Sequence, residues 1–81
     1  MNYIKIIVTG GGGFIGGNLI RYLLNSNYKV LNLDKLTYAA DKKSLKYFNK
    51  QKNYRFEKVD ISNYKKISEI ITSYKPSKII N

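Results

Sequence analysis

The chain has 81 residues and a formal net charge of +10, from 15 Lys and Arg against five Asp and Glu. We expect one small domain rather than a two-domain enzyme, because even a chain of about 60 residues buries only about 60% of the surface that its unfolded form exposes. Cys and His are both absent, which excludes disulfides, thiolate or imidazole metal sites, and Ser-His or Cys-His catalysis.

The first predicted elements are a strand, a glycine loop and a helix. Residues 3–9 (YIKIIVT) form a short β-branched run with apolar side chains on both faces, which is typical of a buried parallel strand. Residues 10–13 are all glycine and predict a loop. From residue 14 the apolar period becomes that of a helix, and residues 25–27 (NSN) end it with turn-forming residues. The predicted apolar stripe of this helix comprises Ile15, Leu19, Ile20, Leu23 and Leu24.

The middle of the chain repeats the order of strand and helix. Residues 29–34 (KVLNLD) predict a second strand, which is followed by a loop over residues 35–41. A weakly amphipathic helix is predicted over residues 42–51. Residues 54–59 (YRFEKV) predict a third strand.

The last part of the chain predicts one more helix and one more strand. Ser62 is the predicted N-cap of this helix, Pro76 stops it, and residues 78–80 form the fourth strand. Alternating strands and helices predict an α/β fold with a parallel sheet and right-handed crossovers. In a doubly wound sheet, here a partial Rossmann fold, the strands lie in the order 3-2-1-4, and ligands bind beyond the carboxyl ends of strands 1 and 4. The predicted apolar face of the last helix comprises Ile67, Ile70, Ile71 and Tyr74.

The glycine loop carries the clearest functional motif. Residues 9–16 read T-G-G-G-G-F-I-G, which puts Gly10, Gly13 and Gly16 in a phosphate-binding pattern between a buried strand and an amphipathic helix. Glycines permit positive φ and let a pyrophosphate approach the backbone, and the helix N-terminus offers unpaired N–H groups. We therefore predict a dinucleotide site rather than an ordinary glycine turn. The motif does not support a P-loop NTPase, because no Lys-Ser/Thr pair follows the glycines.

Two acidic residues at strand ends indicate which nucleotide is bound. Asp34 ends the second strand, 18 residues after Gly16, where a carboxylate can accept both ribose hydroxyls and repels a 2′-phosphate. This favours NAD over NADP, although the neighbouring Lys35 is a cation that could accommodate a 2′-phosphate. Asp60 and Ile61 follow the third strand and could hold the adenine, but Asp60 is equally well explained as a turn residue.

The whole chain resembles the extended short-chain dehydrogenases/reductases, and among them the dTDP-glucose 4,6-dehydratases. The resemblance rests on the segments IIVTGGGGFIGGNLIRYLL, VLNLDKLTYAADKKSL, YRFEKVDISNY and YKPSKIIN. Its most specific part is the run D-K-L-T-Y-A at residues 34–39. By this resemblance, residues 1–81 are the N-terminal portion of an NAD-binding Rossmann domain, and the substrate domain is absent.

The resemblance also implies cofactor contacts and a reaction. The turn meets the pyrophosphate, the end of the second strand surrounds the adenosine ribose, and the end of the third strand holds the adenine. In this family NAD⁺ takes a hydride from sugar C4, water is lost across C5 and C6, and the hydride returns to C6. By this resemblance, the family's acid/base residues and its Tyr-x-x-x-Lys pair lie beyond residue 81. Tyr38 and Lys42 have the spacing of that pair but fall in the loop on the adenosine side, so we expect no catalytic residue in this chain. The complete enzymes are typically homodimers acting on a nucleotide sugar. The implied NAD contacts are Gly10, Gly13, Phe14, Ile15, Gly16, Asp34, Lys35, Leu36, Thr37, Asp60 and Ile61.

The positive charge also fits a function of another class, a basic module that binds nucleic acid. We favour codon bias, because 13 of the 15 basic residues are dispersed lysines, and Lys, Asn, Ile and Tyr make up 41 of the 81 residues. A different nucleotide-sugar epimerase or dehydratase and a non-catalytic dinucleotide sensor are both compatible with the glycine motif.

No apolar run approaches the roughly 20 residues of a membrane helix, and no signal-peptide pattern is present, so we expect a cytoplasmic protein without membrane contact.

Overall fold

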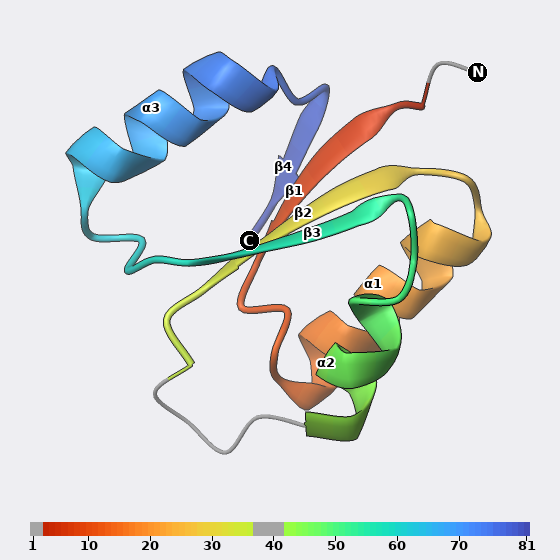
Figure 1. Ribbon diagram of the computed structural model, residues 1–81. Coiled ribbons are helices and arrows are strands. Elements are labelled where there is room, and N and C mark those ends of the chain that lie inside the picture. Colours follow the sequence, from red (N-terminus) through yellow and green to blue (C-terminus); the bar gives the residue numbers. More distant parts are fainter. Residues whose placement is uncertain (1–2, 37–41) are drawn as a thin grey trace.

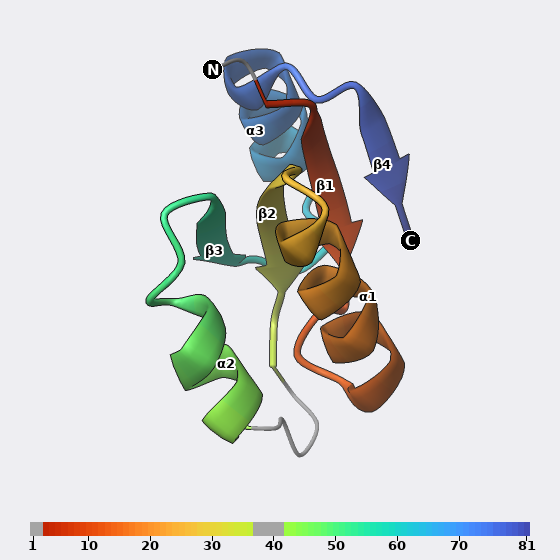
Figure 2. The same ribbon diagram turned by 90° about the vertical axis from the view of Figure 1, so that its right-hand side faces the viewer.

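The computed structural model describes residues 3–36 and 42–81, which form one parallel sheet with helices on both faces (Figure 1). In chain order the elements are β1 (Lys5–Thr9), α1 (Phe14–Asn25), β2 (Lys29–Asp34), α2 (Lys42–Phe48), β3 (Tyr54–Lys58), α3 (Tyr64–Tyr74) and β4 (Lys78–Ile80). The strands are ordered β3-β2-β1-β4, which confirms the predicted Rossmann topology. Figure 2 shows β4 at the outer edge of the sheet, beside β1.

The sheet separates two apolar cores, because alternate residues of each strand point to opposite faces. The core on the side of α1 and α2 contains the buried residues Ile6, Val8, Ile20, Leu23, Leu24, Val30, Phe48 and Tyr54. The core on the side of α3 contains Ile7, Leu31, Leu33, Val59 and Tyr74. In the first core α1 and α2 pack against β1, β2 and β3, whereas in the second α3 packs against β1 and β2.

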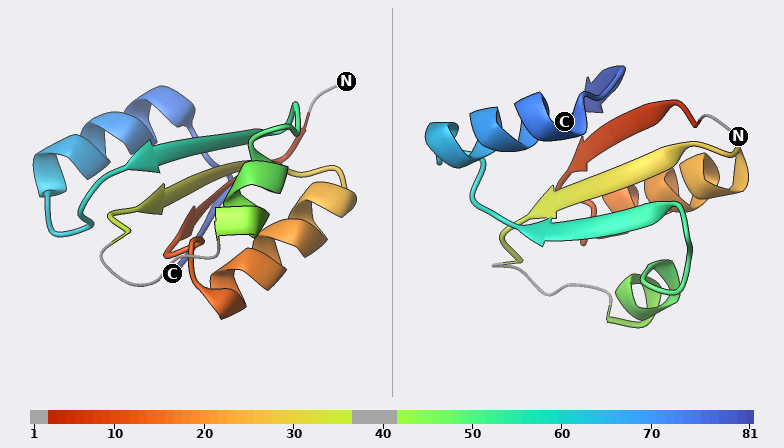
Figure 3. Two further views of the ribbon diagram at one scale, coloured as in Figure 1. Left: turned by 60° about the horizontal axis from the view of Figure 1, so that its bottom comes forward. Right: turned by 45° about the horizontal axis from the view of Figure 1, so that its top comes forward.

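All four strands end at the same edge of the sheet because they run parallel (Figure 3). The central strand β1 pairs with β2 through Ile7 and Leu31, and with β4 through Ile7 and Ile79. At the carboxyl ends, the Thr9 hydroxyl donates to the side-chain carbonyl of Asn81. The glycine turn leaves this edge directly for α1, and it is tied back when the Gly10 N–H donates to the Leu33 carbonyl at 2.9 Å.

Three predicted element boundaries are corrected by a few residues. The first strand begins at Lys5 rather than residue 3, and the third ends at Lys58 rather than residue 59. Helix α2 ends at Phe48 instead of continuing to residue 51. Its end tightens because the Lys50 and Gln51 N–H groups donate to carbonyls only three residues back, at 3.2 and 2.9 Å.

Two side chains at helix starts also differ from prediction. The N-cap of α3 is Asn63, whose side-chain oxygen accepts from the Lys66 N–H at 3.2 Å, whereas the Ser62 hydroxyl donates to Asp60. Ile15 does not belong to the apolar stripe of α1, because it is 82% exposed. The inward side of that first turn is taken by Gly16, which packs against the glycine loop.

Candidate functional site

The turn between β1 and α1 is too tight for side chains at its closest points. Gly10 has a φ of 73°, a left-handed conformation that favours glycine. A Cβ atom on Gly16 would meet the Gly10 carbonyl oxygen and would lie 2.9 Å from the Gly11 Cα atom. A Cβ atom on Gly11 would meet the side chains of Ile20 and Asn32. The helix and the loop can therefore touch only through glycine backbone.

The N-terminus of α1 contains no side chain of its own that would compete with a bound anion for the first N–H groups of the helix. Its N-cap is Gly13, whose backbone is extended with φ −84° and ψ 176°, and no side chain caps the helix. The first turn also contains no acidic residue. Because the first N–H groups of a helix have no partner within it, this end of α1 presents donors and the positive end of the helix dipole. This arrangement suits a phosphate group.

Asp34 is the fixed anionic group next to the turn. Only 4% of the residue is exposed, and one carboxylate oxygen accepts from the Gly12 N–H at 2.8 Å. The other oxygen accepts from the Leu36 N–H at 3.0 Å, and Leu36 has a φ of 55°. A carboxylate offers about four acceptor positions, so the same group can serve both the backbone and ligand hydroxyls. The end of β2 is thus tied directly to the glycine loop.

Asn32 is a functional candidate that sequence reasoning missed. It is fully buried in β2, its side-chain oxygen accepts from the Gly11 N–H at 2.9 Å, and its amide donates to the Tyr54 hydroxyl at 3.1 Å. Burial raises the pKa of Tyr54, so this hydroxyl stays neutral at ordinary pH. The available signal was a polar residue inside the apolar strand KVLNLD. Asn32 therefore fixes the position of the glycine loop through its hydrogen bond with Gly11.

Asp60 acts as the turn residue that the sequence offered as one explanation. One carboxylate oxygen accepts from the Ser62 N–H at 2.9 Å and from the Ser62 hydroxyl at 2.8 Å. The other lies 3.3 Å from the Lys35 ammonium, in a pair whose side chains are about half exposed. These donors, with the Ser62 N–H first, lower the pKa of Asp60. The ion pair joins the loop after β2 to the end of β3, and Lys35 is directed towards Asp60.

The residues at the carboxyl ends of the four strands surround one hollow of about 340 Å³ at this edge of the sheet. Its lining includes five of the predicted site residues, Gly10, Asp34, Lys35, Asp60 and Ile61, together with Thr9 and Asn81 from the ends of β1 and β4. Gly13, Phe14, Ile15 and Gly16 belong to the adjoining turn and the start of α1, and Leu36 follows β2 without lining the hollow. Thr37 lies outside the described residues.

Residues 3–36 and 42–81 contain neither a membrane-spanning helix nor a cluster of metal-binding carboxylates. No helix there is long and apolar enough to cross a membrane. No group of three or more Asp or Glu side chains gathers in a metal-binding arrangement there, and the sequence contains no His or Cys to join one.

The model of the family described as GDP-mannose 4,6 dehydratase matches residues 7–81 of the chain. A probable dTDP-glucose 4,6-dehydratase of Sinorhizobium fredii is 46% identical over 78 residues, which are 96% of this chain and 22% of that protein. The dTDP-glucose 4,6-dehydratase of Haemophilus influenzae is 44% identical over 79 residues, which are 96% of this chain and 23% of that protein. The chain therefore spans less than a quarter of the length of these relatives.

Solved structures show the same fold around a dinucleotide. The dTDP-glucose 4,6-dehydratase of Bacillus anthracis in complex with NAD superposes with a TM-score of 0.86 at 37% identity, covering 94% of this chain and 25% of that one. DesIV of Streptomyces venezuelae, a dTDP-glucose 4,6-dehydratase with NAD and TYD bound, gives a TM-score of 0.74 at 33% identity, covering 83% of this chain and 23% of that one.

Proposed function

Because the chain belongs to the family described as GDP-mannose 4,6 dehydratase, we propose that it forms the adenosine half of an NAD site in a nucleotide-sugar 4,6-dehydratase. The relatives at 44–46% identity make dTDP-glucose the proposed substrate of the whole enzyme and dTDP-4-dehydro-6-deoxyglucose its product. A different nucleotide-sugar epimerase or dehydratase is the alternative within the family. The proposed reaction is a lyase reaction, and we place its catalytic residues outside these 81 residues.

One observation carries the proposal, namely the buried carboxylate of Asp34 bonded to the Gly12 N–H at 2.8 Å. This bond sets an anionic acceptor beside a helix N-terminus that lacks acidic residues, so phosphate and ribose would each meet a group of suitable charge. The glycine positions that a Cβ atom would fill supply the close approach that a pyrophosphate needs. The residues present therefore fit NAD.

The proposed contacts are those that the family resemblance implies, and five of them, Gly10, Asp34, Lys35, Asp60 and Ile61, line the hollow. The backbone of Gly10, Gly13, Phe14, Ile15 and Gly16 would meet the pyrophosphate. Asp34 would accept the ribose hydroxyls, with Lys35, Leu36 and Thr37 around it, and Asp60 and Ile61 would border the adenine. When bound, NAD supplies a hydride acceptor, and this chain's part is to hold its adenosine end. We further propose that the whole enzyme is a cytoplasmic homodimer.

The cofactor role is tested by titrating the 81-residue chain with NAD⁺ and with NADP⁺ in a calorimeter. We expect weak binding of NAD⁺, and weaker binding of NADP⁺ because Asp34 repels its 2′-phosphate. Asp34→Ala should weaken NAD⁺ binding by at least roughly tenfold, since a hydrogen bond to a charged group contributes about 1.5–3 kcal/mol. Glu69→Gln, which changes an exposed carboxylate on α3, is the matched control and should bind like the wild type.

The role within an enzyme is tested in a chimera. The chain would replace the 79 aligned residues of the Haemophilus influenzae relative, and the chimera should convert dTDP-glucose in an NAD-dependent way. Asp34→Ala in that chimera should raise the NAD⁺ concentration needed for half-maximal activity. Binding of NAD⁺ that is equal in the wild type and Asp34→Ala would contradict the proposal.

A further inference from the structure

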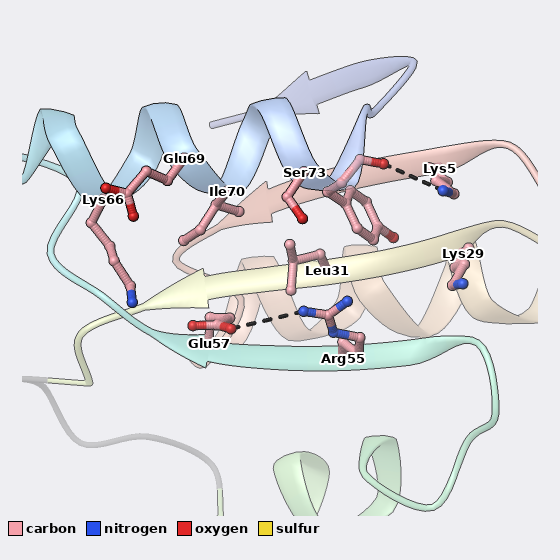
Figure 4. A pocket seen from close by; sticks show the side chains of 10 residues that line it. Lys5, Lys29, Leu31, Arg55, Glu57, Lys66, Glu69, Ile70 and Ser73 are labelled. Carbon is pink, nitrogen blue, oxygen red and sulfur yellow. Dashed lines mark hydrogen bonds and ion pairs between the residues drawn. The ribbon is translucent and has the colours of Figure 1, made fainter.

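A second hollow, of about 230 Å³, lies over the amino-terminal part of the sheet on the side of α3 (Figure 4). Lys5 opens β1, Lys29 opens β2, and Arg55 is the second residue of β3. All three side chains line this hollow, and Figure 4 shows them on three neighbouring strands. None of its lining residues belongs to the lining of the nucleotide hollow.

The cations of this hollow are crowded and incompletely neutralised. Lys5 and Lys29 are register partners on adjacent strands, which lie about 4.8 Å apart in a sheet, and like charges opposite each other destabilise a sheet. The lining holds four cationic side chains, Lys66 included, against the carboxylates of Glu57 and Glu69.

The lining keeps a net positive charge, and its contacts hold the cations only weakly. The ion pair of Arg55 with Glu57 is long, at 3.8 Å, and partly exposed, so it contributes little energy. The Lys5 ammonium donates to the Tyr74 carbonyl at 3.4 Å. No hydrogen bond or ion pair of the Lys29 ammonium occurs within the part of the chain that the structure describes.

A buried hydroxyl in the same lining also lacks a partner. Tyr74 is only 6% exposed, and its hydroxyl makes no hydrogen bond to any described residue. Burial raises the pKa of Tyr74 to about 12, so the hydroxyl keeps its proton at neutral pH and requires an acceptor. Its ring lies 5.4 Å from the Lys5 ammonium and 5.9 Å from the Arg55 guanidinium carbon, and both of these groups are donors only.

We propose that this hollow binds a tetrahedral oxyanion of the phosphate class. Lys29 and Arg55 would neutralise its charge and donate to its oxygens, and the Tyr74 hydroxyl would gain the acceptor that it lacks. A water molecule takes about 30 Å³ in the liquid, so the hollow has room for such an ion with several waters. This site is separate from the NAD site, and it does not depend on the function proposed above.

The test is an NMR titration of the ¹⁵N-labelled chain with inorganic phosphate at low ionic strength, against chloride at equal ionic strength. We expect phosphate to shift the amides of Lys5, Lys29 and Arg55. Lys29→Ala should weaken binding by roughly tenfold and Tyr74→Phe, which keeps the ring, by about fivefold, as loss of a charged and a neutral hydrogen bond predicts.

Lys58→Ala is the matched control, since it removes an exposed lysine of β3 outside the hollow, and it should bind phosphate like the wild type. Shifts confined to residues 10–13, or equal affinities in Lys29→Ala and Lys58→Ala, would overturn the proposal. Glucose 1-phosphate identifies the source of the ligand: tighter binding than inorganic phosphate indicates a phosphoryl group of a metabolite, and equal binding indicates the free ion. Both of these results support the site.

Discussion

Asn32 occupies an interior position of β2 where its neighbours Leu31 and Leu33 are also almost fully buried. A buried amide is stabilising only when its hydrogen bonds are made, and Asn32 makes them to the Gly11 N–H and the Tyr54 hydroxyl. The same carboxamide and the side chain of Ile20 together favour glycine at position 11, because a Cβ atom there would strike both. Asn32 thus fixes the position of a loop residue and contributes to its identity.

Replacing Asn32 with Leu would leave the Gly11 N–H and the Tyr54 hydroxyl buried without partners. Each unsatisfied group costs roughly 1–3 kcal/mol, so Asn32→Leu should lower the free energy of unfolding by about 2–6 kcal/mol, measured by urea unfolding followed by circular dichroism. Tyr54→Phe leaves one buried donor, the Asn32 amide, without its partner and should cost about 1–3 kcal/mol. Equal losses in the two variants would show that the contact with Gly11 contributes nothing.

Tyr74 gives the fold a dependence on alkaline pH. Burial raises its pKa from 10.0 to about 12, against a smaller lowering by Arg55. Because the folded state holds this proton more tightly, the contribution is fully present below pH 10 and is lost as the pH rises through about 12. The free energy of unfolding should therefore fall more steeply over this window in the wild type than in Tyr74→Phe. Identical slopes in urea titrations at pH 9 to 12 would refute this assignment.

At the scale of elements, the first turn of α1 contains two adjacent glycines, Gly16 and Gly17, in different surroundings. A Cβ atom on Gly16 would strike the backbone of the glycine loop, which cannot move aside as a flexible side chain can. A Cβ atom on Gly17 would make only an ordinary contact, 3.7 Å from the Gly11 carbonyl oxygen. Close packing of helix on loop therefore requires glycine at the first position and not at the second.

The two positions predict opposite effects of the same substitution. Gly17→Ala should stabilise the chain by about 0.5–1 kcal/mol, because alanine is the better helix former. Gly16→Ala should destabilise it by about 1–3 kcal/mol through overpacking, and it should also weaken NAD⁺ binding. Thermal unfolding of both variants checks the pair, and a stabilised Gly16→Ala would contradict the close packing.

At the scale of the whole molecule, the outer edge at β4 is the weak part of the described sheet. Among residues 3–36 and 42–81, β4 pairs only with β1, and Ile79 in it is 47% exposed. An apolar hollow adjoins this edge on the α3 side, lined by Ile7, Leu33, Ile61, Ile67, Ile71 and Ile79. A strand with one unpaired edge next to exposed apolar surface favours association between chains. The alternative function, binding of nucleic acid, predicts a different result, because the affinity for DNA or RNA would fall steeply as the salt concentration rises.

We expect the isolated 81-residue chain to be marginally stable, with a urea midpoint below about 3 M, and to self-associate as its concentration rises. Ile79→Lys should reduce this association in sedimentation velocity, because a charge at a strand edge opposes pairing. Ile4→Lys is the matched control, since Ile4 is 54% exposed and does not line the apolar hollow. A cooperative transition well above this midpoint would show that the edge costs little.

The sequence alone determined the glycine turn and the acidic residue at the end of β2, because these follow from steric limits on the backbone and from spacing. It also determined the strand order, because alternating strands and helices predict a doubly wound sheet. It also named five residues that the fold brings to one hollow, Gly10, Asp34, Lys35, Asp60 and Ile61. Only the tertiary structure decided the partners of Asn32, the pairing of Lys35 with Asp60, and the cluster of Lys5, Lys29 and Arg55 beside Tyr74. Those contacts join residues 19 or more positions apart, and they depend on strand register and side-chain direction, which no local pattern encodes.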